Sequence, residues 1–145
     1  MKFISSSYDP ENGTSTVVMQ HLGEKFTGEA KIHPEEADKK SEFAGCSYAE
    51  TRATIKGLKY ERKIAKEKAD AALDFVKSCE GYANFDAESP SAKVMYRQLN
   101  QRIKRVNDLA DEINDLYRAL DMSIKRRDII LKAIQHKKSK EDNNA

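Results

Sequence analysis

The chain has 145 residues, of which 39% are hydrophobic and 34% are charged, and its formal net charge at pH 7 is +2. This composition fits one small, charge-rich, helix-dominated domain. The sequence shows no signal peptide and no apolar run long enough to span a bilayer, so we expect a soluble, cytoplasmic protein that does not bind membranes. A net charge this small also argues against a protein that binds DNA or RNA.

The first third of the chain predicts a small antiparallel sheet. Between residues 25 and 32 apolar and small residues alternate with polar ones, which is the pattern of a strand with one face on a core. Residues 14–22 are rich in Thr and Val, and turn-forming residues flank them at 9–13 and 23–24. We therefore predict a meander of three strands at residues 2–8, 14–22 and 25–33. A sheet of this size must pack on the helices that follow.

A first long helix is predicted from residue 43 to residue 82, after a polar linker at residues 34–42. Its apolar seam is thin and contains small residues, which allow close approach of a neighbouring backbone: Ile55, Leu58, Ala65, Ala69, Ala72, Val76 and Cys79. Arg62 falls on this seam, where an apolar residue is expected. The simple interpretation is that its stem lies along the seam while its guanidinium reaches water, and the alternative is that it belongs to a functional site.

A second long helix is predicted from residue 90 to residue 137, with Ser89 as its N-cap and Pro90 at its first position. Its stripe has helical spacing: Leu99, Ile103, Val106, Ala110, Ile113, Tyr117, Leu120, Ile124, Leu131 and Ile134. Such a helix spans on the order of 70 Å, whereas a compact domain of this size is only about 30 Å across, so it must project or be covered by other subunits. We predict a disordered tail at residues 138–145. The expected fold is therefore a single helix-dominated α+β domain.

The sequence offers no catalytic or metal-binding constellation. His21, His33 and His136 fall in separate elements without Cys, Asp or Glu at ligand spacing. No glycine-rich phosphate loop and no nucleophile elbow is present. The helical carboxylates alternate with Arg and Lys, as on a solvated helix surface. We therefore expect a protein that is not an enzyme and that uses neither a metal nor a cofactor.

Arginines mix with aromatic and amide side chains around the loop between the helices. Arg presents a planar fork that suits phosphate oxygens, and aromatic faces stack on bases, so this mixture predicts a nucleotide site. Its members are Phe75, Tyr82, Asn84, Phe85, Tyr96, Arg97, Asn100, Arg102 and Arg105. The alternative is that the aromatic residues only cap the open end of the hairpin while the arginines pair with carboxylates such as Asp108.

The sequence also shares features with two other classes of protein. Three strands followed by a helix is also the order of a double-stranded RNA-binding domain, and residues 63–69 are rich in lysine. However, that basic segment lies in the middle of the predicted helix and is interleaved with acids, which argues against duplex binding. The competing class is a coiled-coil adaptor whose helices bind another helix and which has no small-molecule ligand.

In size and in the order of its elements, the chain resembles the first-described family of phage proteins that antagonise the Thoeris defence system. The resemblance spans the whole chain, through residues 2–4, 16–19, 26–30 and 96–100. It implies an N-terminal antiparallel sheet, two long C-terminal helices, and assembly from dimers into hexamers. It also implies a sponge in the host cytoplasm, which sequesters a defence signal without cleaving it. The ligands in that family are cyclic ADP-ribose isomers and, in some members, cyclic oligonucleotides such as cyclic trinucleotides.

The resemblance further implies pockets between subunits that use aromatic and arginine side chains. In this sequence Phe75 and Arg102 are the leading candidates, followed by Asn84 and Arg105. Arg52, Arg62 and Phe85 are secondary candidates.

Overall fold

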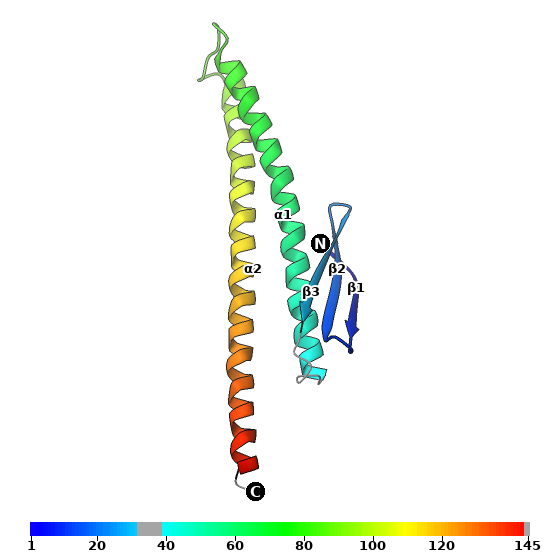
Figure 1. Cartoon of the computed structure of the whole chain (residues 1–145). Helices are drawn as coiled ribbons and strands as arrows, with labels where there is room; N and C mark the ends of the chain where they lie inside the picture. Colours follow the sequence, from blue (N-terminus) through cyan, green and yellow to red (C-terminus); the bar gives the residue numbers. More distant parts are fainter. Residues whose placement is uncertain (32–38, 144–145) are drawn as a thin grey trace.

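The computed structural model of the protein describes residues 1–31 and 39–143. Its elements are β1 (Lys2–Asp9), β2 (Thr14–His21), β3 (Glu24–Lys31), α1 (Lys39–Glu80) and α2 (Pro90–Asn143). The predicted helix-dominated α+β fold is confirmed. The two helices form a long antiparallel hairpin, and the sheet lies against the N-terminal half of α1 on the side away from α2 (Figure 1).

The sheet is an antiparallel meander in the order β1-β2-β3. A two-residue turn joins β2 to β3, and both of its residues have positive φ, 52° at Leu22 and 81° at Gly23. Such a turn matches the right-handed twist of the paired strands. A longer turn joins β1 to β2, where the Gly13 amide donates to the Asp9 carbonyl oxygen at 2.8 Å. The turn-forming residues at 9–13 and 23 thus form turns between the strands, as predicted from the sequence.

The inner face of the sheet packs directly on α1. Val17, Met19 and Ala30 are buried against Ala49 and Ala53, both of which have no exposed surface. Gly28 makes the closest approach, because a Cβ atom on this residue would lie only 1.9 Å from the Ala49 carbonyl oxygen. The predicted alternation in β3 is confirmed for residues 26–31, and the small residues on both elements let strand and helix backbones touch.

A second core cluster joins the two helices. Ile55 and Leu58 of α1 pack with Leu109 and Ile113 of α2, and Leu109 has no exposed surface. Towards the loop, the contact surface of α1 narrows to small or medium residues such as Ala69 and Val76, which are also buried. The predicted apolar seam of the first helix is confirmed, while Arg62 on that seam is exposed.

The ends of the helices differ from the predicted bounds. α1 begins at Lys39 rather than at residue 43, so most of the predicted linker, with Ile32 and His33 before it, lies outside the described residues. α2 continues to Asn143, and the prediction of a disordered tail is wrong for residues 138–143. The segment is polar, but Lys and Glu, which make up half of residues 138–143, propagate a helix well once it is nucleated.

The start of α2 agrees with the prediction. The Ser89 hydroxyl accepts a hydrogen bond from the Ala92 amide at 3.2 Å, and the Ser89 carbonyl accepts one from the Lys93 amide at 3.0 Å. Ser89 is therefore the N-cap, and Pro90 occupies the first helical position, where no amide donor is needed. This cap fixes the point at which the connecting loop joins α2.

Candidate functional site

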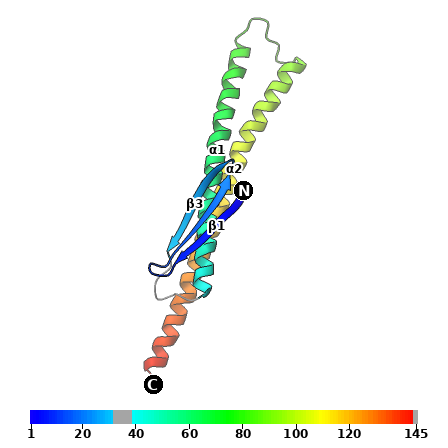
Figure 2. The ribbon, with the colours of Figure 1, turned by 90° about the vertical axis from the view of Figure 1, so that its right-hand side faces the viewer.

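The helices stand apart where they meet the connecting loop, at residues 81–89 (Figure 2). Side chains from both helices line a hollow of about 410 Å³ just below the loop. Its walls include Phe75 and Val76 of α1 and Val94, Leu99 and Arg102 of α2. Phe75 is 62% exposed and Val94 is 47% exposed, so this apolar wall is open to solvent.

A second hollow, of about 550 Å³, lies at the loop itself. Phe75, Ser91 and Met95 line both hollows, which therefore adjoin each other. The loop contributes Asn84 and Phe85, and the Phe85 ring meets the Tyr96 ring edge-on with the centroids 6.4 Å apart. We call the two hollows together the tip site.

The side chains of the tip site suit a ligand that has both a base and phosphates. The exposed Phe75 ring offers a stacking surface, and Asn84 offers an amide with donors and an acceptor. Arg102 donates one hydrogen bond to the Lys68 carbonyl oxygen, at 3.2 Å. A guanidinium has five N–H donors, so this contact orients Arg102 and leaves donors for a phosphate.

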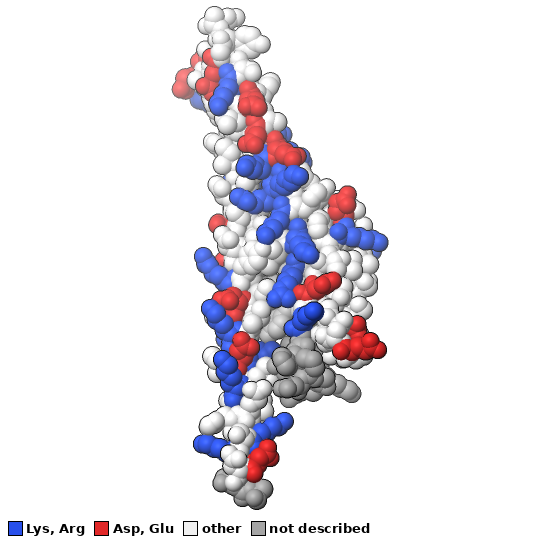
Figure 3. Space-filling model, viewed as in Figure 1, with Lys and Arg blue, Asp and Glu red and all other residues white. Residues whose placement is uncertain are grey.

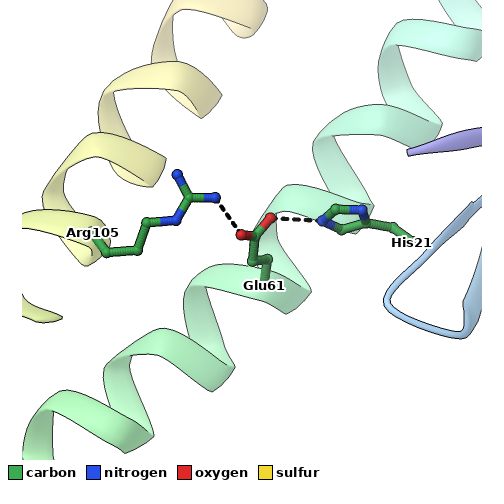
Figure 4. Close-up of polar contacts among 3 residues, drawn as sticks. All are labelled: His21, Glu61 and Arg105. Carbon is green, nitrogen blue, oxygen red and sulfur yellow. Dashed lines mark hydrogen bonds and ion pairs between the residues drawn. The ribbon is translucent and has the colours of Figure 1, made fainter.

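Arg105 lies one turn beyond Arg102 on α2, and it is held in an ion-pair network (Figure 4). Its guanidinium pairs with Glu61 of α1, while the other carboxylate oxygen of Glu61 lies 2.6 Å from His21 Nε2 at the end of β2. An ionised carboxylate can only accept, so His21 donates through Nε2. The network joins the sheet, α1 and α2. Arg105 lines neither hollow of the tip site, and Glu61 already partly compensates its charge.

Glu61 is the centre of this network, and its side chain is only 18% exposed. Burial raises the pKa of its carboxyl, but hydrogen bonds from His21 and Arg105, together with their charges, outweigh burial and lower the pKa overall. The same pairing raises the pKa of Arg105. The carboxylate therefore stays ionised and retains both partners at neutral pH.

Arg52 and Arg62 were predicted to share a site with Phe75 and Arg102, but the structure does not bring them to the tip site. Arg52 lies near the opposite end of α1, where it donates to the Glu29 carbonyl oxygen of β3 at 2.7 Å and lines a different hollow. Arg62 is exposed and lines none of the described hollows. Arg97 and Asn100 also lie apart, on a shallow surface of α2 with Lys93 and Lys104.

Sequence reasoning missed the residues that form the floor and walls of the tip site, such as Ser91, Val94, Met95 and Gln98. One sequence signal could have indicated them: Val94 and Met95 are apolar residues in the first two turns of the second helix, but neither is part of its predicted apolar stripe. Among the described residues, no group of His, Cys, Asp or Glu is arranged to hold a metal ion.

Neither helix, over its described residues, has a stretch that is both long and apolar enough to cross a bilayer. Comparison of the chain with protein-family models, with curated proteins and with solved structures finds no match.

Proposed function

We propose that this protein binds and sequesters a cyclic nucleotide of the cyclic ADP-ribose type at the tip site, without cleaving it. The resemblance to phage proteins that antagonise Thoeris supplies the biological setting for this proposal: a phage protein that withholds a defence signal from the immune effector of the host. Cyclic oligonucleotides are a second ligand class under the same proposal.

The proposal rests on one observation: Phe75 of α1 and Arg102 of α2 line the same hollow at the open end of the hairpin. Phe75 also lines the adjoining hollow that contains Asn84 and Phe85. An aromatic face, a guanidinium and an amide are the three groups that a base, a diphosphate and a ribose hydroxyl require. The volumes of the two hollows also fall within the range that small-molecule sites occupy, about 300–1,000 Å³.

A second copy of the chain completes the site in this proposal. A sponge must hold its signal more tightly than the effector does, and nanomolar affinity corresponds to roughly 12 kcal/mol. An open surface with Phe75 at 62% and Tyr82 at 72% exposure leaves a bound ligand largely in water. Covering this apolar wall with another subunit would desolvate both the ligand and Arg102, which strengthens their pairing.

Ligand depletion tests the proposal directly. The purified protein is mixed with cyclic ADP-ribose isomers or with cyclic trinucleotides, free ligand is measured after ultrafiltration, and bound ligand is released by heat denaturation. We expect stoichiometric depletion of a cyclic nucleotide and its recovery intact. Recovery of a hydrolysed product would show that the protein is an enzyme and not a sponge. If no cyclic nucleotide is depleted, the proposal is wrong, and the coiled-coil adaptor becomes the favoured class.

The Arg102→Ala variant identifies the site. We expect it to lose depletion while it keeps its helical circular dichroism and its molar mass in light scattering. The matched control is Arg118→Ala, because Arg118 is also an exposed arginine of α2, lies 3.9 Å from Asp115 and lines neither hollow of the tip site. Unchanged depletion by Arg102→Ala would remove this arginine from the site, and a monomer in light scattering would contradict completion of the site by a second copy.

A further inference from the structure

Five basic residues form a straight row along α1, on the face between the sheet and α2. They are Arg52, Lys56, Lys59, Lys63 and Lys66, and we call them the basic stripe. Successive members are four and three residues apart, so they stack on one helix face over about 21 Å. Figure 3 shows basic side chains gathered along the hairpin beside the sheet.

The two ends of the basic stripe have different environments. Arg52 and Lys56 donate to the Glu29 and Thr27 carbonyl oxygens of β3, at 2.7 and 2.6 Å, and so cover the edge of the sheet that β3 forms. Lys59, Lys63 and Lys66 are exposed, and within the described part of the chain none of these three forms an ion pair. These three closely spaced lysines therefore have no ion-pair partner among the described residues.

An apolar wall runs beside these lysines on α2. The Lys59 ammonium lies 5.0 Å from the centre of the Tyr117 ring, which places this side of α2 against the basic stripe. Tyr117 is 44% exposed and Ile103 is 42% exposed, with the half-buried Val106 and Ala110 between them at helical spacing. Around Tyr117 the surface is hollowed to about 550 Å³. The basic stripe and these apolar positions are the two sides of one surface, which is hollowed around Tyr117 and which we call the groove.

We propose that this groove binds an acidic amphipathic α-helix of a partner protein. The basic stripe repeats every seven residues, as do the apolar positions Ile103, Ala110 and Tyr117 on α2. A partner helix with apolar residues on one face and Asp or Glu along its flank has the same repeat, so it meets both walls over several turns. The partner helix supplies the acids that Lys59, Lys63 and Lys66 lack.

Two other occupants fit the groove less well. A single-stranded nucleic acid would use the lysines, but it would leave Ile103 and Val106 without an apolar partner. A second copy of this chain offers Asp108, Asp111 and Asp115 on α2, but this acidic face covers only half the length of the basic stripe. The neighbouring Leu109 and Ile113 are already buried within the hairpin, so they cannot supply the apolar contact.

The test uses a fluorescein-labelled synthetic helix of about three heptads, with leucine on one face and glutamate along its flank. We expect saturable binding in fluorescence anisotropy that weakens as salt is added. The triple variant Lys59→Glu, Lys63→Glu, Lys66→Glu is expected to weaken binding by about tenfold or more. It should instead bind a peptide in which lysine replaces glutamate.

A matched control variant carries three charge reversals elsewhere, Lys93→Glu, Lys104→Glu and Lys137→Glu, and should bind the acidic peptide as the wild type does. Ile103→Ser should weaken peptide binding without affecting an oligothymidine probe. No binding of the acidic peptide, or equal weakening by both triple variants, would overturn the proposal. Tighter binding of oligothymidine that is lost on reversal of the three lysines would assign the groove to nucleic acid instead, and self-association lost in the same variant would assign it to a second copy.

Discussion

Replacement of Gly28 by alanine should separate the sheet from the hairpin. The new Cβ would lie 1.9 Å from the Ala49 carbonyl oxygen and 2.5 Å from the Ala53 amide nitrogen, whereas real Cβ contacts essentially never fall below 3.0 Å. β3 and α1 must therefore move apart by about 1 Å. Both obstructing atoms belong to the backbone, so no change of side-chain rotamer can relieve the clash.

The cost follows from the core that this movement opens. Overpacking usually costs about 1–3 kcal/mol, and here the upper end applies because backbone meets backbone. The cluster of Val17, Met19 and Ala30 against α1 would lose contact along its whole length. We expect a loss of about 3 kcal/mol in the free energy of unfolding and a fall of roughly 10 °C in Tm.

Urea denaturation followed by far-ultraviolet circular dichroism measures this loss, and hydrogen exchange of the β2 amides reports on the sheet itself. Two glycines serve as controls. At Gly57 the nearest atom to a new Cβ is the flexible Met1 side chain at 2.8 Å, and at Gly81 nothing lies closer than 3.4 Å, so alanine should be tolerated at both. A Gly28→Ala variant as stable as Gly81→Ala would refute the close contact between β3 and α1.

Three further substitutions test other parts of the fold. Leu22→Asn should raise the free energy of unfolding by about 0.5–1 kcal/mol in urea denaturation, because Leu22 is 55% exposed and has a φ of 52°, which asparagine adopts at lower cost. A destabilised variant would contradict this account of the turn. Ser89→Ala should cost about 1 kcal/mol through loss of the cap on α2, and an unchanged Tm would mean that the cap contributes nothing. Glu61→Gln should cost about 1–3 kcal/mol at pH 7, since it leaves His21 and Arg105 without their carboxylate. Because folding lowers the pKa of Glu61, the contribution of its carboxylate to stability is fully present above the ordinary pKa of 4.5 and is lost as the pH falls through the lowered pKa. The free energies of unfolding of the wild type and the variant should therefore converge in acid. A difference that stays constant at every pH would exclude the ion pair as the cause.

Much of the fold could be predicted from local patterns. The alternation at Phe26, Gly28 and Ala30, the Ser89 cap and the seam of α1 all depend on neighbours in the sequence, and each is confirmed. The predicted stripe of the second helix contains Ala110 and omits the adjacent Leu109, which has no exposed surface in the structure. A helix face packed on another helix is wide enough to include both positions, and only tertiary contacts decide which one is central.

The candidate site was less predictable, because it depends on the register between distant segments. The family resemblance groups Arg52 with Arg102 as candidate ligand-binding arginines, because it specifies the kind of side chain and not its place along the helices. The register of the hairpin places Arg102 opposite Lys68, while Arg52 faces the edge of β3. Likewise, no sequence pattern indicates that Glu61 binds Arg105, forty-four residues away. Pairings of this kind follow from how α1 and α2 pack, and not from periodicity within either helix.

The unequal lengths of the two helices divide α2 into parts that open independently. The Tyr48 hydroxyl of α1 reaches the Ser123 carbonyl oxygen at 3.3 Å, and beyond this point most α2 side chains are exposed, including Ile129 and Ile130. Amide protons of the last turns should therefore exchange with solvent through local fraying. Those near Leu109 and Ile113 should exchange only when the whole hairpin opens. A single helix would thus show two levels of protection, with the boundary near Ser123, where α2 meets Tyr48 of α1.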